Sequence, residues 1–260
     1  MKVAVCVIAK NEAPFLAEWL EYHLMMGVDR FVLYDNNSSD HTRAVCQRYA
    51  DYVTVIGWPG NLNPQRAAYR HFAVNFGGQF DWTAFIDADE FIVCKNEQNL
   101  KGWLRYHERE VALMLEWRIF CTNGHLARPP GLVIENFTKA HSVAPQPNVK
   151  TICRADQIEI DDIVSPHRFS YRDGRTACRP PQSDLLIHHY ILRSYEDLVM
   201  KVSRGDAWNP VHSEHNRQHV MKVVRSKLLK YDHGDLADTH MLRYVEALRG
   251  RLAARGAATD

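Results

Sequence analysis

The sequence predicts an α/β protein with a mainly parallel, doubly wound central sheet flanked by helices, and a helical C-terminal extension. Three observations support this prediction. Apolar, β-branched runs alternate with segments of helical period over the first 90 residues, a polar segment follows three of these runs, and helical periodicity returns beyond residue 194. A chain of 260 residues that is 46% hydrophobic can form one sizeable core, which excludes a disordered chain or a rod.

The first half of the chain supplies the regular elements. The seven-residue apolar run Val3–Ala9 suits a strand buried on both faces. Helical spacing starts at Pro14 and stops at Gly27, and these residue types are typical of helix starts and ends. Asp40 is expected to cap a helix that runs to about Tyr49. The other expected elements are strands at 31–34, 52–57, 82–86 and 111–117 and a helix at 63–76.

The second half is less regular. Residues 121–190 hold much of the proline and several short apolar runs, which indicates loops and short strands around a pocket. Helical spacing then returns over 195–255. We therefore expect a core over 1–194 and a helical segment over 195–260 that packs on the core or extends it.

The position of three polar segments predicts a ligand-binding cleft. Residues 10–12, 35–40 and 87–90 each follow an expected strand. In open α/β sheets, ligands bind at the carboxyl ends of the strands. The three segments are therefore expected to converge on one cleft.

Composition excludes several classes of protein. The chain has 32 basic and 31 acidic side chains, so it lacks the basic excess of a nucleic-acid binder. Its six scattered cysteines are typical of buried thiols in a reducing compartment. The longest apolar run is far shorter than the roughly 20 residues of a membrane helix, so we expect a cytoplasmic protein. Residues 198–255 carry 11 Lys/Arg against 6 Asp/Glu, which allows weak peripheral attachment at the inner face of a membrane.

The segment Asp87-Ala88-Asp89 is a candidate metal site. It directly follows an apolar strand, and Glu90 adds a third carboxylate. Carboxylates this close repel one another unless a cation or hydration offsets their charge. Their hard oxygen atoms suit Mg²⁺ or Mn²⁺. The alternative is a solvated turn at the end of a strand.

The loop from Asp35 to Asp40 also has two interpretations. Asp35 could accept hydrogen bonds from a ribose or a base, as acidic residues do after the second strand of nucleotide-binding folds. Alternatively, the loop only caps a helix. A dinucleotide cofactor is disfavoured, because residues 9–14 lack the glycines that let a pyrophosphate approach the backbone.

Further candidates lie towards the C-terminus. His188 and His189 follow an apolar run, so one ring should face the cleft and the other the core, and a neutral imidazole could complete a metal site. Lys201 and Arg204 lie three residues apart on an expected helix and share a face, where they could neutralise a diphosphate. An ordinary exposed basic helix is the alternative.

These motifs together resemble those of the family 2-type glycosyltransferases, in the branch near family 92. The resemblance rests on Lys10-Asn11-Glu12, Asp35 through Asp40 and Asp87 through Phe91, in that order, and covers about residues 3–207. It continues through Gln65-Arg66, Trp117 with Phe120, Gly124-His125, Lys150, Pro166-His167, His189-Tyr190 and Arg204-Gly205. Two segments depart from the family pattern. His41-Thr42 stand where glycine is common, and Thr122-Asn123 stand where serines are common, in the expected acceptor region.

The resemblance implies a GT-A fold, a nucleotide-sugar donor that is expected to be a UDP-sugar, and a Mn²⁺ or Mg²⁺ ion. It assigns the metal to Asp87, Asp89 and His189. It assigns the nucleotide-sugar to Ala9, Asn11, Glu12, Asp35, Arg66, Asp87, Ala88, Lys201 and Arg204.

We therefore expect a metal-dependent, inverting glycosyltransferase of the hexosyl type that acts in polysaccharide biosynthesis on a glycan or lipid-linked acceptor. Cations beside the diphosphate stabilise the leaving group, and inversion needs a base near the acceptor hydroxyl. The sequence leaves that base open among His125, Glu116, Asp161, Asp162 and Asp206. A nucleotidyltransferase is a less favoured alternative, because a glycine-rich phosphate loop is missing. A non-catalytic nucleotide- or carbohydrate-binding module is the other alternative.

Overall fold

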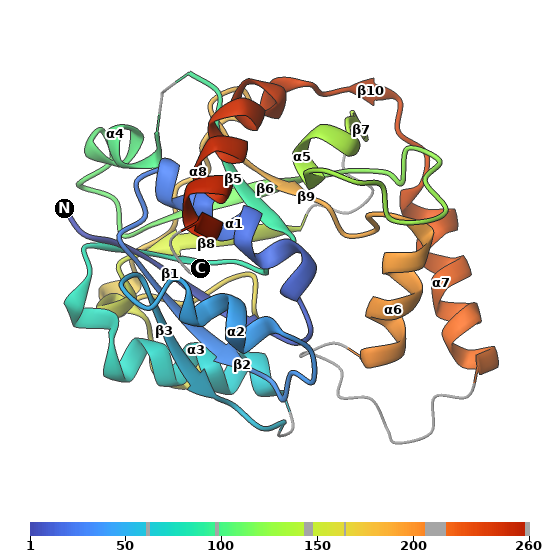
Figure 1. Ribbon diagram of the computed structural model, residues 1–260. Helices are drawn as coiled ribbons and strands as arrows, with labels where there is room; N and C mark the ends of the chain where they lie inside the picture. The colour runs from blue at the N-terminus through green and yellow to red at the C-terminus, as the bar shows by residue number, and fades with distance from the viewer. Residues whose placement is uncertain (61–62, 97–98, 143–147, 164, 206–216, 258–260) are drawn as a thin grey trace.

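The computed structural model describes residues 1–260 except 61–62, 97–98, 143–147, 164, 206–216 and 258–260 (Figure 1). Its centre is an eight-stranded sheet in the order β3-β2-β1-β4-β8-β6-β9-β5. The strands of this sheet are β1 Val3–Ala9, β2 Arg30–Asp35, β3 Val53–Gly57, β4 Trp82–Phe85, β5 Glu90–Cys94, β6 Ala112–Ile119, β8 Val149–Cys153 and β9 Leu185–His189. A small second sheet pairs β7 Lys139–Ala140 with β10 Leu236–Ala237.

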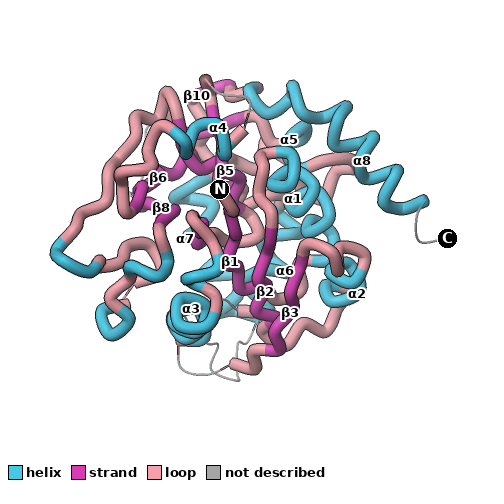
Figure 2. The backbone as a smooth tube through the Cα atoms, turned by 90° about the vertical axis from the view of Figure 1, so that its left-hand side faces the viewer, coloured by secondary structure: helices cyan, strands magenta, loops and turns pink. Residues whose placement is uncertain are grey.

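Helices cover both faces of the large sheet (Figures 1 and 2). The helices are α1 Ala13–Met25, α2 Thr42–Gln47, α3 Pro64–Asn75, α4 Leu100–Arg105, α5 Val133–Asn136, α6 Tyr195–Arg204, α7 Arg217–Tyr231 and α8 Val245–Ala257. Short 3-10 helices lie at Gly77–Gln79, Ala155–Gln157, Ile160–Asp162, Arg172–Gly174 and His240–Tyr244. The predicted α/β architecture is confirmed, and the strands and helices expected before residue 90 appear within a few residues of their predicted bounds.

The half-sheet β3-β2-β1-β4 is parallel throughout. Every residue of β1 is buried, because the strand lies between two helical layers. Its alternate side chains point to opposite faces. Val5 and Val7 join a core cluster with α1, whereas Cys6 and Ile8 join a second cluster with α3. A continuous apolar run is therefore the sequence signature of this central strand.

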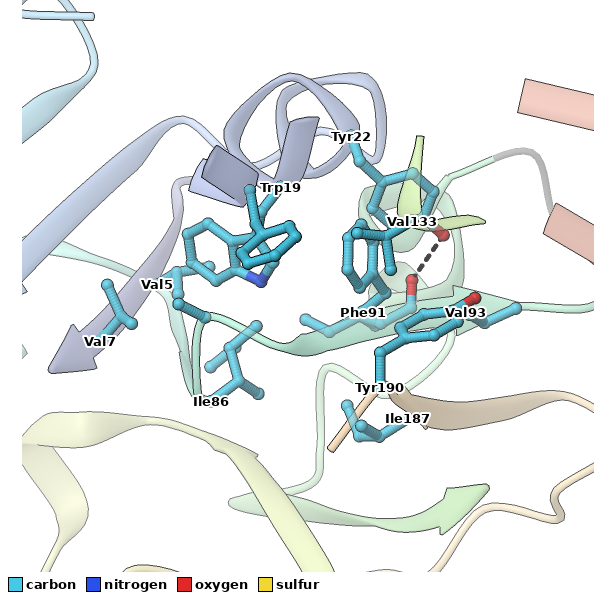
Figure 3. Close-up of a cluster of buried hydrophobic side chains, with 14 of the residues drawn as sticks. Val5, Val7, Trp19, Tyr22, Ile86, Phe91, Val93, Val133, Ile187 and Tyr190 are labelled. Carbon is cyan, nitrogen blue, oxygen red and sulfur yellow. Dashed lines mark hydrogen bonds between the residues drawn. The ribbon is translucent and has the colours of Figure 1, made fainter. Parts of the chain in front are cut away.

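The larger core cluster joins α1 to the sheet (Figure 3). Trp19 and Tyr22 of α1 are fully buried and lie over the turn and strand that follow β4. The Trp19 indole Nε1 donates to the carbonyl of Glu90 at 2.7 Å, and the Tyr22 hydroxyl donates to the carbonyl of Ile92 at 2.8 Å. These bonds hold the first residues of β5 against α1.

The second half of the sheet differs most from the sequence-based expectation. Residues 121–190 were expected to form loops and short strands, and they do, but the sequence did not predict that two of these strands join the large sheet, β8 between β4 and β6 and β9 between β6 and β5. Strand β8 is antiparallel to both neighbours, and β5 is antiparallel to β9. Lysine and histidine within these strands obscured their apolar pattern, because the sequence does not indicate which polar groups find buried partners.

The C-terminal helices pack on the rest of the chain. In α8, Leu248 is fully buried, while Arg251 and Arg255 pair with the buried carboxylate of Glu21 on α1 at 2.7 and 3.1 Å. Helices α6 and α7 lie side by side at the edge of the molecule (Figure 1). Among the described residues, we find no helix with the length and apolar composition needed to cross a bilayer. None of the six cysteines, all of which lie in the described part of the chain, forms a disulfide, and five are buried.

Candidate active site

The turn Asp87-Ala88-Asp89 connects β4 to β5 and lines a pocket of about 420 Å³. The pocket lies at the carboxyl ends of β1 and β4, between the sheet and helices α6 and α7. Its lining residues are Ile8, Ala9, Lys10, Glu12, Gln65, Asp87, Ala88, Asp89, Trp117, Asn148, Pro166, His167, His189, Ile191, Lys201, Arg204, Gly205, Lys227 and Tyr231. A larger hollow of about 630 Å³ lies at the opposite, amino ends of β1 and β2.

Asp87 is held by two neighbours. Gln65 Nε2 of α3 donates to its Oδ1 at 2.7 Å, and Lys150 Nζ of β8 donates to its Oδ2 at 2.8 Å. The carboxylate of Asp87 remains about one-third exposed. It therefore faces the pocket while its position is fixed from two sides.

Glu90 turns away from the pocket and is fully buried. Its Oε2 accepts the backbone N–H of Asp87 at 2.9 Å and lies 3.5 Å from Lys150 Nζ. Burial raises the pKa of Glu90 well above its usual range, against the opposing effect of Lys150. Burial alone would lower the pKa of Lys150, but the adjacent carboxylates of Asp87 and Glu90 raise it, so the ammonium stays charged. Glu90 therefore supports the turn from below.

Asp89 is paired with groups from two other elements. Lys201 Nζ of α6 donates to Asp89 Oδ2, and His189 Nε2 of β9 lies 3.5 Å from the same oxygen. Burial acts to raise the pKa of Asp89, yet Lys201 and His189 hold it well below its usual range. Burial lowers the pKa of His189, which favours a neutral imidazole. His189 faces the pocket, whereas His188 lies on the other side of the strand beside Asp238.

The side chains of Asp87, Asp89 and His189 are of types that bind a divalent cation, but their ligand atoms do not converge on a common point. Carboxylate oxygens and an imidazole nitrogen are suitable ligands for Mn²⁺ or Mg²⁺. His189 Nδ1 and Glu90 Oε1 are buried without a hydrogen-bond partner, 3.7 Å apart. Within the described part of the chain, no group of three His, Cys, Asp or Glu side chains converges at metal-binding distance. A cation bound by Asp89 would therefore have to replace Lys201.

A second ion-pair network lies at the end of β1. Glu12 is buried and accepts hydrogen bonds from Arg193 at 2.9 Å and from Arg204. Arg193 also donates to the carbonyl of Ala88 at 3.3 Å, and its guanidinium lies 3.6 Å from the centre of the Phe15 ring. Glu12 thereby fixes the end of α6 and the D-x-D turn relative to each other.

The other predicted donor-binding residues are placed differently. Ala9 and Ala88 line the pocket with their small side chains. Asn11 adopts a left-handed backbone conformation, with φ 53°, and its carbonyl accepts from Arg204. Asp35 is fully buried, pairs with Arg43 Nε at 2.6 Å and does not line the pocket. Arg66 is half-buried and does not line it either, whereas its neighbour Gln65 does.

The loop after β2 therefore supports the site from behind. Ser38 Oγ accepts the backbone N–H of Asn11 at 3.0 Å, and Asn11 Oδ1 accepts that of Ser39 at 2.7 Å. Asp40 accepts from the backbone N–H groups of Ala13 and Thr42. Of the three polar segments, two line the pocket, and the third holds the turn after β1.

The four described base candidates lie outside the pocket lining. Glu116 is next to Trp117 on β6 and points to the opposite face, where Gln182 donates to it. His125 packs its ring against that of Phe137, and Asp161 pairs with Arg70. Asp162 is exposed. The fifth candidate, Asp206, falls outside the described residues.

Several polar residues of the site received no role from the sequence alone. Arg193 was not singled out, and Lys150, Gln65 and His167 appeared only as positions of family similarity. Trp117 and His167 meet edge to face, and burial lowers the pKa of His167 to about 4. A lysine within the apolar run of β8 was the one signal that could have indicated a buried charge pair.

Comparison with known proteins agrees with this arrangement. A parallel half-sheet with a carboxylate-lined pocket at its carboxyl edge is the arrangement of the GT-A fold, the fold class of this chain. More particularly, it belongs to glycosyltransferase family 92, because the model of that family matches residues 1–233.

Curated relatives have the same family name. The chain is 32% identical to a glycosyltransferase family 92 protein of Oryza sativa subsp. japonica over 209 residues, which cover 77% of this chain and 35% of the relative. It is 37% identical to one of Arabidopsis thaliana over 236 residues, which cover 85% of this chain and 40% of the relative. The chain thus spans well under half the length of these two relatives.

Solved structures show more distant similarity. The crystal structure of S. aureus TarS 1-349 in complex with UDP-GlcNAc is similar with a TM-score of 0.49 and 15% identity, over 98% of this chain and 72% of that one. Glucosyl-3-phosphoglycerate synthase from Mycobacterium tuberculosis in complex with Mn²⁺, UDP and glucosyl-3-phosphoglycerate is similar with a TM-score of 0.37 and 16% identity. That match covers 60% of this chain and 58% of the synthase chain.

Proposed function

We propose that this chain transfers a hexosyl group from a UDP-sugar to a hydroxyl group of a glycan or lipid-linked acceptor, with inversion and with a divalent cation. The supporting observation is the composition of one pocket, in which Asp87, Asp89 and His189 lie next to Lys201 and Arg204. In a metal-bound nucleoside diphosphate the metal is positive and the diphosphate is negative. The acidic groups of the pocket match the metal, and the basic groups match the diphosphate. Polysaccharide biosynthesis is the process that we assign to this activity.

The residues of the pocket have separate proposed roles. Asp87, Asp89 and His189 would hold Mn²⁺ or Mg²⁺, which supplies positive charge to the leaving diphosphate. Lys201, once it leaves Asp89, and Arg204 face the same diphosphate. Lys150 and Gln65 keep Asp87 in place, and Arg193 positions the Ala88 carbonyl through its bond to Glu12. Fixed charges of this kind lower the barrier because they need not reorganise as the bond breaks.

The family assignment favours glycosyl transfer over the two alternatives. A nucleotidyltransferase would release pyrophosphate from a nucleoside triphosphate, and a binding module would hold a nucleotide without turnover.

Thr122 and Asn123 stand where the family commonly has serines, yet neither lines the pocket. Thr122 instead bonds Asp232 through its backbone N–H and its hydroxyl, at 2.8 and 3.0 Å. This departure therefore lies outside the proposed donor site.

Thermal unfolding tests the donor and the metal together. UDP-, GDP- and CMP-sugars are screened with and without Mn²⁺, because a ligand that binds only the folded state stabilises it by about 2.7 kcal/mol at 100 times its Kd. We expect a shift for a UDP-sugar that requires both components, and transfer activity with the same donor. A UDP-sugar shift of equal size without Mn²⁺ would show that the metal assignment is wrong.

Two variants separate the roles of Asp89 and Lys201. We expect Asp89→Asn to lose the Mn²⁺-dependent part of the shift and to reduce kcat/KM at least 100-fold, as for the loss of one strong electrostatic group. Lys201→Met should bind Mn²⁺ alone more tightly, because no ammonium competes for Asp89, yet bind the UDP-sugar more weakly. Asp51→Asn, at an exposed carboxylate away from the pocket, is the matched control. Full activity of Asp89→Asn would exclude the proposed site.

A further inference from the structure

Helix α7 is the most basic element of the structure beside the pocket. Its 15 residues contain five basic side chains, Arg217, Lys222, Arg225, Lys227 and Lys230, and no acidic one. The whole chain has a formal charge of only +1. This helix therefore carries a local excess of positive charge that the chain as a whole lacks.

The two sides of α7 differ sharply. Val220, Val224 and Tyr231 are buried against the rest of the molecule. At 100° per residue the opposite side carries Lys222, Arg225 and Leu229. Met221 lies at its border, where its sulfur accepts a hydrogen bond from the Tyr195 hydroxyl of α6 at 3.9 Å. These four residues define what we call the outer face of α7. All four are exposed, Met221 at 39% and Leu229 at 65%. Figure 1 places the helix at the edge of the molecule.

We propose that the outer face of α7 docks on a membrane surface rich in anionic phospholipid headgroups. Lysine and arginine are attracted to such a surface, and exposed apolar side chains between them can enter the boundary between headgroups and acyl chains. A soluble polyanion would use the charges alone, whereas Met221 and Leu229 give the face an apolar component. The combination of charge and apolar side chains on one helix face therefore favours a membrane over a soluble polymer.

Docking in this orientation would determine which class of acceptor can reach the pocket. This part of the inference rests on the proposed function. Lys227 and Tyr231 line the pocket from the other side of the same helix. A helix with its side chains is about 10 Å across, so the pocket would lie roughly that far above the headgroups. The matching acceptor is a lipid-linked sugar whose hydroxyl extends about 10 Å from the membrane surface.

Co-sedimentation with lipid vesicles tests the docking face without requiring catalysis. We use phosphatidylcholine vesicles with and without phosphatidylglycerol, and expect binding that needs the anionic lipid and weakens with salt. Lys222→Glu with Arg225→Glu should reduce vesicle affinity about tenfold or more. Met221→Ser with Leu229→Ser should also reduce it while leaving the preference for anionic lipid.

The matched control makes the same charge change elsewhere. Arg48 and Arg105 are exposed on other parts of the surface, so Arg48→Glu with Arg105→Glu should leave vesicle binding within about twofold. Equal losses in the control and in the α7 variant would overturn the proposal. A second result would also overturn the proposal: vesicle binding that needs Lys222 and Arg225, does not need Met221 and Leu229, and is abolished by soluble polyphosphate. That result would identify a soluble polyanion as the partner.

Donor binding by the same variants separates the two proposals. Lys222 and Arg225 lie outside the pocket, so these variants should keep the Mn²⁺-dependent thermal shift with the UDP-sugar. If the wild-type protein binds vesicles but shows no such shift, the docking face stands and the proposed donor fails. If the shift is present and anionic vesicles do not bind, the donor site stands and the docking face fails.

Discussion

At the scale of single residues, two lysines from distant parts of the chain neutralise the D-x-D turn. Lys150 is buried between Asp87 and Glu90, and Lys201 reaches Asp89 from α6. Their environments differ, because Lys150 is 1% exposed whereas Lys201 is 25% exposed at the pocket wall. A buried charge is costly to expose or to leave unpaired, whereas a charge beside solvent can exchange partners. Lys150 therefore has a structural role, and Lys201 is free to exchange Asp89 for a ligand.

Replacement of Lys150 should destabilise the protein in a way that depends on pH. Lys150→Met leaves Glu90 buried without its counter-charge, so its pKa rises further. A carboxyl with a raised pKa in the folded state stabilises that state fully below its ordinary pKa near 4.5, and this stabilisation is lost as pH rises. We expect a loss of about 3–5 kcal/mol at pH 8 and a smaller loss at pH 5, measured by urea unfolding.

A second substitution isolates the contribution of Glu90. In the background of Glu90→Gln, the destabilisation caused by Lys150→Met should no longer grow between pH 5 and pH 8. A penalty with the same pH dependence in both backgrounds would assign the effect to another group.

At the scale of elements, buried polar contacts fix helices that propensity alone would leave loosely placed. Glu18 of α1 is buried and accepts the backbone N–H groups of Val133 and Ile134 at 2.8 and 3.1 Å, which caps the start of α5 from another helix. Ser194 and Asp197 form a capping box at the start of α6. That box sets where α6 begins and hence where Lys201 and Arg204 lie.

Glu18 should give the protein a measurable loss of stability with rising pH. Burial raises the pKa of Glu18 from 4.5 to about 7. The protonated carboxyl therefore contributes its full share to the free energy of unfolding below pH 4.5, and this stabilisation is lost as pH rises to 7. Relative to Glu18→Gln, the wild type should lose up to about 3 kcal/mol of unfolding free energy over that interval. Chemical denaturation at several pH values measures the difference. The exposed Glu246→Gln is the control, and parallel curves for wild type and Glu18→Gln would contradict the assignment.

At the scale of the whole molecule, the C-terminal helices share the core of the sheet. One hydrophobic cluster runs from Val3 on β1 to Leu248 on α8 and includes Val220 and Val224 of α7. The expected division at residue 194 therefore separates two parts of the sequence that pack together. We propose that the two parts unfold together, because neither can expose its side of the cluster without exposing the other.

Substitution at Leu248 tests this proposal. Leu248 is fully buried, so Leu248→Ala should lower the free energy of unfolding by about 2–5 kcal/mol through lost burial and a cavity. Fluorescence and circular dichroism should report one common transition. Leu126→Ala, at a side chain that is 76% exposed, should change stability by less than about 0.5 kcal/mol. Two separate transitions would mean that residues 195–260 fold as a unit of their own.

The sequence alone predicted the elements whose signal is local. Three signals indicated the parallel half-sheet: the run Val3–Ala9, the stop at Gly27, and the alternation of strands and helices up to residue 85. Each signal is visible in a short stretch of sequence, because a strand buried between two helical layers is apolar along its length and its helices repeat at helical spacing. The same pattern placed the D-x-D turn at the carboxyl edge of the sheet. It also indicated that His189 and His188 face opposite sides.

Tertiary structure decided the rest, because the remaining signals connect residues far apart in the chain. The pairs Lys150–Asp87, Lys201–Asp89 and Arg193–Glu12 join positions 63, 112 and 181 residues apart, and no local period records such contacts. Strands β8 and β9 lie within the sheet although they carry Lys150, His188 and His189, and the charge partner of Lys150 comes from a distant part of the chain. The sequence thus placed the carboxylates at the sheet edge, and the fold determined which cations neutralise them.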